Sequence, residues 1–559
     1  MLKNILPLLI IVIFAFFLRI YKIDSVPSSL NWDEVSHGYN AYSILKTGQD
    51  EWGQNFPLVN FRAYGDYPLP LNLYLTIPFI KFLGLNELSI RLPHTLLGTL
   101  TVFSSYFLFW GITKNRYLSL FGSLLVAIDP WHLFPSRFVL QSNLSVALLT
   151  SAAALFVNSL ASKKKYLLSL SALCLGLTLF AYHTTRIFSP LFLFSILVIY
   201  RHELLIALKT KWGKVAAVIL VAFFLPLLFI LTNKESQARS KWVFIIDQGA
   251  IAKIEEKRNN SKLSPSVARL LYNKPVYFIS EFTNNYLGYF SPQFLFVKGG
   301  TQYQFSIPKF GVLYAINILF FYSGLSILLK KLNEKPYKLI LIWLLLAPIP
   351  ASLTLEKFAV LRSSAVLPIP ELLTAIGAFS AWNYIKRLSN FRHAILGIYA
   401  VGLTISVGFY LHYLFKIYSY QYSQSWQYGY KQVADYLKTK YSDYDAIVVT
   451  KKYGEPHEFL LFFWIWDPNV YQKDPNLVRF SQSDWFWVDR FDKFYFMNDW
   501  DIPKETNKPW KLESGRTTPI VGGKTLLITS PGNYPPDWRK LETVNFLDGS
   551  VAFEILEKI

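Results

Sequence analysis

The chain has 559 residues, of which 52% are apolar and only 16% are charged. A soluble chain usually carries about a quarter charged residues, so the composition argues against an ordinary soluble enzyme. The net charge of +20 does not indicate nucleic acid as a partner, because the cations stand in small clusters between apolar runs. The single cysteine, Cys174, excludes an intrachain disulfide and a cysteine metal site.

Long apolar runs predict a polytopic α-helical membrane protein. Each run approaches the roughly 20 residues that a helix needs to cross a bilayer. Met1 to Tyr21 has the composition of a signal peptide, but no small-residue cleavage site follows, so we expect it to remain as the first helix. We predict about eleven spans, centred near residues 12, 100, 124, 150, 174, 193, 222, 319, 345, 373 and 405.

The basic clusters predict the orientation of these spans. Short loops rich in lysine and arginine face the cytoplasm, and here they alternate with loops that are poor in cations. We therefore expect a multi-pass protein of the plasma membrane with a cytoplasmic N-terminus and an outer C-terminus. Large outer segments follow at about 23–87, 233–308 and 418–559, which predicts a transmembrane domain over 1–417 and an extracytoplasmic domain over 418–559.

The outer tail has the pattern of a small α/β domain. Residues 430–441 are expected to be helical, and the β-branched runs 445–450 and 525–530 are typical of buried strands. Two aromatic runs, 462–466 and 485–487, suit stacking on sugar rings, a hydrophobic core or a membrane-facing skirt. The sequence leaves these three alternatives open.

The first outer segment begins with two adjacent carboxylates, Asp33 and Glu34, just after the first span. Acidic side chains beside hydrocarbon are costly unless they are exposed, paired or functional. One interpretation is a catalytic pair. The other is a solvated loop start, or an acidic N-cap of a helix through 35–45.

Several motifs then occur in a fixed order along the chain. The acidic pair is followed by the stretch 64–71 (YGDYPLPL), by Arg91-Leu92-Pro93 at the second span, and later by 285–292 (NYLGYFSP), 350–354 (PASLT) and 361–363 (LRS). In this order they resemble the GT-C superfamily of membrane glycosyltransferases, particularly the bacterial protein-mannosyltransferase and aminoarabinose-transferase group. The resemblance covers roughly residues 1–420.

The resemblance implies an enzyme that transfers a hexosyl or pentosyl group from a polyprenyl-phosphate donor at the outer face of the cell envelope. The acceptor would be a hydroxyl of a glycan, a lipid or a protein. Asp33 would be the base that takes its proton, with Glu34 as a second catalytic candidate. Configuration would invert, and the leaving lipid phosphate would need cations rather than a general acid.

Cations predicted near the outer surface are candidates to bind that phosphate. The preferred ones are Arg137 and Arg362, and the others are Arg186, Arg62 and Lys357. The alternative for each is an arginine or lysine that only reaches to the interface from a helix end. In the aminoarabinose-transferase relatives the aromatic-proline motif carries a lysine, whereas Asp66 and Tyr67 precede Pro68 here. Either Arg62 replaces that lysine or other loops hold the phosphate.

Four further side chains are candidates for a second acid or for positioning the acceptor, namely Asp129, His37, His183 and Tyr64. Asp129 is equally suited to a turn before Pro130, and a lone histidine is more often structural. We predict no tightly bound cofactor, because no His/Cys/Asp cluster has ligand spacing, although a divalent metal is left open. A transporter or flippase of lipid-linked glycans and a non-catalytic envelope scaffold are the alternative functions.

Overall fold

The structure is a computed structural model that describes residues 2–230, 232, 243–388, 392–482, 485–505, 508, 510–515, 517–518 and 523–558. The chain forms two compact units. The first consists of Met1–Tyr21 and His94–Leu411, and the second of Lys22–Pro93 and His412–Ile559. The break near 411 lies close to the predicted domain boundary. The first outer segment, however, belongs to the unit that holds the C-terminal region rather than to the unit of the long helices.

The regular elements described in the first unit are helices. They are α1 (Leu2–Ile20), α4 (Glu87–Thr113), α5 (Arg116–Ile128), α6 (Pro130–Leu133), α7 (Gln141–Ala161), α8 (Tyr166–Leu177), α9 (Thr185–Ile199), α10 (Arg201–Leu208), α11 (Lys211–Ile230), α13 (Gln248–Asn259), α14 (Pro265–Leu271), α15 (Lys274–Gly288), α16 (Ile318–Lys330), α17 (Lys335–Leu346), α18 (Ile349–Ser352), α19 (Ile369–Leu388) and α20 (Arg392–His412). The first residues of α4 belong to the second unit. Short 3-10 or π turns lie at Pro135–Arg137, Thr178–Phe180, Gln293–Lys298, Ala315–Asn317 and Ser364–Val366.

Every predicted span centre lies within one of these helices. By length and apolar composition, 4 of the described helices qualify as membrane spans, or up to 6 if each of two bent helix pairs counts as one span. The helical membrane architecture is therefore confirmed in outline, whereas the count of eleven spans is not. The predicted outer segment 233–308 contains α13, α14 and α15, while its residues 233–242 lie outside the described part.

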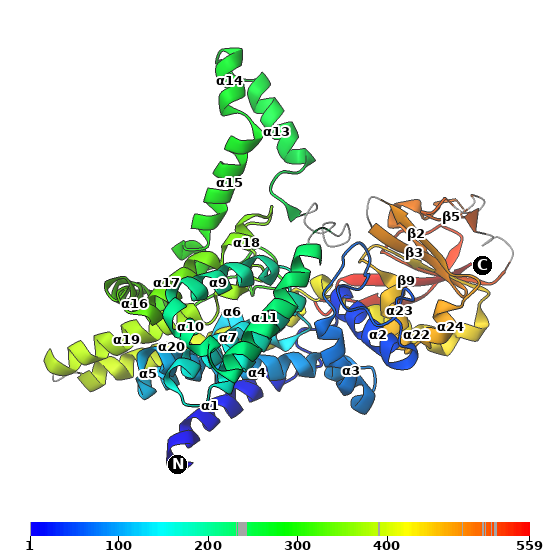
Figure 1. Ribbon diagram of the computed structural model, residues 1–559. Coiled ribbons are helices and arrows are strands. Elements are labelled where there is room, and N and C mark those ends of the chain that lie inside the picture. Colours follow the sequence, from blue (N-terminus) through cyan, green and yellow to red (C-terminus); the bar gives the residue numbers. More distant parts are fainter. Residues whose placement is uncertain are drawn as a thin grey trace. The chain divides into compact units, whose positions relative to one another are not determined.

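The second unit combines helices with a mixed sheet (Figure 1). Its helices are α2 (Trp32–Thr47), α3 (Leu71–Leu83), α21 (Ser419–Gln421), α22 (Tyr430–Lys440), α23 (Pro456–Trp464) and α24 (Pro468–Gln472). Its strands are β1 (Ala446–Thr450), β2 (Val478–Gln482), β3 (Trp485–Phe491), β4 (Phe494–Met497), β5 (Trp510–Lys511), β6 (Thr517–Thr518), β7 (Thr525–Thr529), β8 (Trp538–Asn545) and β9 (Val551–Lys558). Short 3-10 or π turns lie at Tyr413–Tyr418, Gln424–Trp426, Tyr441–Asp443 and Asp499–Asp501.

The sheet confirms the predicted α/β character of the tail. Its 7 strands run in the order β2-β3-β4-β1-β7-β9-β8, and β5 pairs with β6 in a separate ribbon. Strand β1 lies at the centre and is parallel to both β4 and β7. All residues of β1 and β7 are buried, as expected of β-branched and leucine-rich central strands. The predicted helix at 430–441 is α22.

Helix α2 is defined by strong signals at both ends. Asn31 is its N-cap and, with Glu34, forms a complete capping box. Gly48 ends it in the left-handed conformation with φ +75°. Inside the helix, Gly38 allows α23 to approach closely, because a Cβ there would lie 2.5 Å from the ring of Phe462. The predicted helix thus exists, but its cap is Asn31 rather than the acidic pair.

Candidate functional site

Asp33 is the exposed carboxylate of the acidic pair and lies in the first turn of α2. The hydroxyl of Tyr64 donates a hydrogen bond to Asp33 Oδ1. Burial, followed by the charge of Asp33, raises the pKa of Tyr64 well above its ordinary value, so the phenol stays protonated and remains a donor. The structure thereby joins two predicted site residues, one from each end of the outer segment.

Glu34 has a different environment from Asp33. It is fully buried, and Arg91 holds it through Nε–Oε1 and Nη2–Oε2 contacts of 2.8 Å each. Arg91 also donates to the backbone carbonyls of Ile23 at 2.8 Å and Ser29 at 2.6 Å. This bidentate pair fixes the segment that leads into α2 to the start of α4. A carboxylate with both oxygens bound in this way is suited to positioning and not to proton transfer.

An aromatic stack continues from Tyr64. Its ring lies 6.4 Å from that of Trp485 at an interplanar angle of 20°, and Trp485 in turn stacks on Trp487 at 5.9 Å. Gly65 makes this possible, since its φ is +97° and a Cβ would lie 2.6 Å from the Trp485 ring. Both tryptophans are half-buried. The other aromatic run differs, because Phe462 and Phe463 are core residues.

His37 and Arg62, two more candidates in this unit, have structural surroundings. His37 is buried in α2, with Nε2 at 3.5 Å from Thr76 Oγ1. Burial lowers the pKa of His37 to about 4, so this imidazole is neutral near pH 7. The Arg62 guanidinium lies over the ring of Phe486, 4.3 Å from its centroid. Neither contact brings these side chains to Asp33.

In the first unit, the side chains of Arg137 and Asp129 form hydrogen bonds with backbone groups at helix ends. Arg137 is fully buried, and its Nη1 and Nη2 donate to the carbonyls of Leu18 at 2.6 Å and Tyr21 at 2.7 Å, at the C-terminal end of α1. Asp129 is the N-cap of α6 and accepts from the Trp131 amide at 2.9 Å. The structure therefore favours the turn interpretation of Asp129.

The remaining predicted cations of this unit differ in exposure. Arg186 is buried and donates to the Leu179 carbonyl at 3.1 Å, close to the half-buried His183. Arg362 is half-buried and contacts Glu356 Oε2 at 2.9 Å. Lys357 is exposed, with Glu281 as a distant partner at 4.0 Å. Arg362 and Lys357 are thus the candidates of this unit whose charged ends reach solvent.

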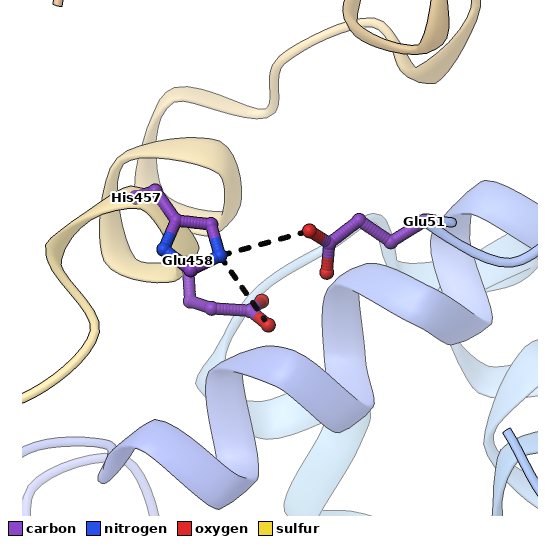
Figure 2. Close-up of side chains that lie close together, drawn as sticks. All are labelled: Glu51, His457 and Glu458. Carbon is purple, nitrogen blue, oxygen red and sulfur yellow. Dashed lines mark ion pairs between the residues drawn. The ribbon is translucent and has the colours of Figure 1, made fainter. Parts of the chain in front are cut away.

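Sequence analysis missed a buried cluster of Glu51, His457 and Glu458 (Figure 2). Glu51 follows α2, and the other two belong to the first turn of α23. His457 Nε2 lies 3.7 Å from Glu51 Oε1 and 3.9 Å from Glu458 Oε1. Burial, followed by the charge of Glu51, raises the pKa of Glu458 well above its usual range. No spacing signal predicts this cluster, because its members stand at opposite ends of the chain.

Comparisons with known proteins agree with the resemblance found in the motifs. Residues 9–238 match the family model described as dolichyl-phosphate-mannose-protein mannosyltransferase. No curated protein matches the chain. The solved structure of ArnT from Cupriavidus metallidurans in the apo state is 12% identical, with 99% of this chain and 97% of that chain covered and a TM-score of 0.51.

A second solved structure matches over a smaller share of its length. It is the archaeal oligosaccharyltransferase AglB from Archaeoglobus fulgidus, in complex with an inhibitory peptide and a dolichol-phosphate, at 13% identity and a TM-score of 0.49. The match covers 82% of this chain and 63% of that chain, so this protein spans less than two thirds of its length. The mannosyltransferase family model over residues 9–238 agrees with the predicted resemblance to the GT-C glycosyltransferases, and the likeness to ArnT shows a shared fold over 99% of the chain.

Proposed function

We propose that the protein is an inverting glycosyltransferase that moves a sugar from a polyprenyl-phosphate donor to a hydroxyl acceptor at the outer face of the plasma membrane. The family match supports the donor class, because dolichyl phosphate mannose is a sugar on a polyprenyl phosphate. The apolar helices support a membrane location. About eleven spans, with a cytoplasmic N-terminus and an outer C-terminus, complete the proposed topology.

The observation that supports this proposal most strongly is that the two carboxylates of the acidic pair differ in exposure and in hydrogen-bond partners. Asp33 is exposed and oriented by the Tyr64 hydroxyl, whereas Glu34 is buried and neutralised by Arg91. One carboxylate is therefore available to an acceptor, and the other holds the helix that presents it. A general base has to lie within hydrogen-bond reach of the proton that it removes, and an exposed carboxylate at a helix start meets that need.

The reaction balances with these groups alone. Asp33 takes the proton of the acceptor hydroxyl while the oxygen of that hydroxyl attacks the anomeric carbon. The bond from that carbon to the phosphate oxygen breaks, configuration inverts, and the lipid phosphate leaves as an anion that needs no proton. Cations stabilise this leaving charge. In the first unit, Arg362 and Lys357 are the candidates for this role, because their charged ends reach solvent, whereas Arg137 and Arg186 are buried and bond to backbone carbonyls.

The half-buried Trp485 and Trp487 provide a surface for the acceptor. Their rings are parallel within 24°, and Trp485 stacks on the same Tyr64 that orients Asp33. An aromatic ring that keeps part of its surface in solvent can pack against the apolar face of a sugar ring or a planar group of a lipid carrier, and both indoles are only half-buried by their neighbours. This arrangement favours a glycan or glycolipid acceptor, without requiring one particular sugar.

The decisive experiment compares Asp33→Asn with Asp24→Asn. Asp24 is an exposed carboxylate of the same outer segment and contacts only Ser25 among the described residues, at 3.2 Å. Transfer is measured by mass spectrometry, with membranes that contain each variant and lipid-linked donor extracted from cells that lack the protein. We expect Asp33→Asn to reduce the rate about 10²–10⁴-fold, the usual contribution of a general base, and Asp24→Asn to leave it unchanged. Full activity of Asp33→Asn would exclude the proposed base, whereas absence of transfer by the wild type would favour a flippase or scaffold function.

A further inference from the structure

The buried cluster of Glu51, His457 and Glu458 has the spacing of metal ligands. The distances from His457 Nε2 to the two carboxylate oxygens, 3.7 and 3.9 Å, are too long for hydrogen bonds. Ligand atoms about 2.0–2.1 Å from one Zn²⁺ ion in tetrahedral geometry lie about 3.4 Å apart. All three ligand atoms lie within 4.8 Å of one another. Small side-chain movements would therefore close the cluster around one ion.

Unsatisfied oxygens point to a missing partner in this cluster. The side chains of Glu51, His457 and Glu458 are 0%, 2% and 1% exposed. Oε2 of Glu51 and Oε2 of Glu458 are buried and make no hydrogen bond to the residues that the structure describes. Buried polar atoms without partners are rare and costly. Two of them in one cluster, on two acidic residues, indicate a cation or a shared proton.

The nearest cationic side chains already have other partners. Arg479 Nη2 donates to the Glu51 backbone carbonyl at 2.6 Å, and its guanidinium stacks over Trp52 at 4.4 Å. Lys451 bonds to Asp489 at 2.7 Å and to Glu513 at 2.9 Å. These cations soften the local negative charge, but neither makes a described hydrogen bond to a carboxylate of the cluster.

The other nitrogen of the imidazole faces a carboxylate beyond hydrogen-bond distance and makes no described hydrogen bond. His457 Nδ1 lies 3.6 Å from Glu455 Oε2. Metal-bound histidines usually donate their second ring N–H to a carboxylate or carbonyl, which fixes the tautomer and directs the first nitrogen at the metal. Tyr471 holds Glu51 in place, since its hydroxyl donates at 3.1 Å to Oε1, the same oxygen that lies 3.7 Å from His457 Nε2. The second oxygen, Oε2, makes no described hydrogen bond.

We propose that Glu51, His457 and Glu458 bind one divalent transition-metal ion of the Zn²⁺ class, with Glu455 as the partner of the imidazole Nδ1. One nitrogen and two carboxylate ligands suit Zn²⁺, Mn²⁺ or Co²⁺. The ion fastens the turn after α2 to the first turn of α23 (Figure 2). Since α2 also carries Asp33, the ion stabilises the element that presents the proposed base. Metal binding itself does not depend on the proposed transfer reaction.

The competing explanation is a proton shared between Glu51 and Glu458. Glutamine has the shape of a protonated glutamic acid, so Glu458→Gln separates the two explanations. With a shared proton, the variant folds with undiminished stability and behaves like the wild type toward metals. With a bound ion, the variant loses a ligand and the ion with it.

The experiment uses the full chain in detergent, with any affinity tag removed and bound metal stripped by EDTA. Titration calorimetry with Zn²⁺ is expected to show one tight site, and Zn²⁺ is expected to raise the thermal unfolding midpoint. Glu455→Gln is expected to weaken binding about 10–100-fold, as is typical for loss of an outer partner. Glu458→Gln should weaken it further and abolish the thermal shift.

The control variant is Asp489→Asn, which changes a fully buried carboxylate that has its own cation, Lys451. It should lower stability and leave the Zn²⁺ affinity unchanged. A second readout needs no variant, because Co²⁺ bound to the wild type through one imidazole and oxygen ligands gives visible d–d absorption that Zn²⁺ displaces. Absence of Zn²⁺ binding by the wild type, or equal binding by Glu458→Gln, would overturn the proposal.

Discussion

Helix α2 has a buried glutamate, Glu34, in its first turn, and a second buried glutamate, Glu51, lies just after its end. The two differ in the groups that surround their carboxylates. In the first turn, both carboxylate oxygens of Glu34 accept hydrogen bonds of 2.8 Å from the guanidinium of Arg91. After the helix, Glu51 Oε1 accepts a hydrogen bond from Tyr471 and lies 3.7 Å from His457 Nε2. Its Oε2 makes no described hydrogen bond. Both side chains are 0% exposed.

This difference separates a fully hydrogen-bonded ion pair, Glu34 with Arg91, from a cluster around Glu51 whose buried oxygens lack hydrogen-bond partners among the described residues. A buried carboxylate is tolerated when a hydrogen-bonded cation meets it, when it is protonated, or when it binds a metal. The first condition holds at Glu34 and explains why Asp33, its neighbour, is the exposed member of the pair. In the cluster around Glu51, either a proton on Glu458 or a bound metal ion fulfils one of the other two conditions, and the metal titration distinguishes them.

The largest effect is expected from breaking the ion pair of Glu34 with Arg91. Glu34→Gln leaves the Arg91 guanidinium buried without a carboxylate, although its bonds to the carbonyls of Ile23 and Ser29 remain. Removal of one partner from a buried ion pair typically costs about 3–5 kcal/mol. We expect a large fall in the unfolding midpoint of the purified chain, measured by thermal or chemical unfolding, and no change in Zn²⁺ affinity.

The matched control for this prediction is Glu87→Gln. Glu87 also pairs with a cation of the same unit, Lys431, but the lysine side chain is 49% exposed. Solvent-exposed pairs contribute about 0–1 kcal/mol, so Glu87→Gln should be nearly neutral. Equal destabilisation by both variants would contradict the distinction between the buried and the surface pair.

A smaller effect on stability is expected from the titration of His37, whose buried imidazole is neutral near pH 7. Burial lowers the pKa of His37 from 6.5 to about 4 in the folded chain. Between these values the unfolded chain binds a proton that the folded chain does not, so stability falls as pH decreases from about 6.5 to 4. The loss by pH 5 should be about 2 kcal/mol.

The measurement is the pH dependence of unfolding for the wild type and for His37→Asn. The variant removes this titration, so the difference between the two unfolding free energies should change by that amount from pH 7 to pH 5. Other buried acids, such as Asp50, titrate in both proteins and cancel in the difference. Parallel stability curves would show that folding leaves the pKa of His37 unchanged and would contradict the lowered pKa of a buried, neutral imidazole.

Much of this architecture was predictable because it depends on local patterns. Apolar runs predicted the helices, and the β-branched run at 445–450 predicted the central strand β1. Within the acidic pair, the role of Glu34 was also encoded locally, since Asn31 three residues earlier completes a capping box. That spacing favours a structural Glu34 and leaves Asp33 as the proposed base.

The contacts that were not predictable join distant parts of the chain. Asp33 meets Tyr64 through a turn that depends on the positive φ of Gly65, and Glu51 meets His457 across most of the sequence. The position of Arg137 was not predictable for another reason. Arg137 was expected at the surface because it stands in a predicted outer loop, but the carbonyls at the end of α1 lack helical partners and bind it instead.

The smallest effect is expected from removing the Tyr64 hydroxyl, and this change tests most specifically how Asp33 is oriented. Tyr64→Phe removes the hydroxyl that orients Asp33 and keeps the ring that stacks on Trp485 at 6.4 Å. Because Asp33 is exposed to water, the loss of this hydrogen bond should raise the barrier by about 1 kcal/mol, the net contribution of a typical hydrogen bond. This corresponds to a several-fold fall in kcat with KM nearly unchanged. Steady-state transfer by the purified chain measures both constants, and unfolding should be nearly unaffected. A rise in KM at constant kcat would instead make Tyr64 a ligand of the acceptor, and the base would then be oriented by α2 alone.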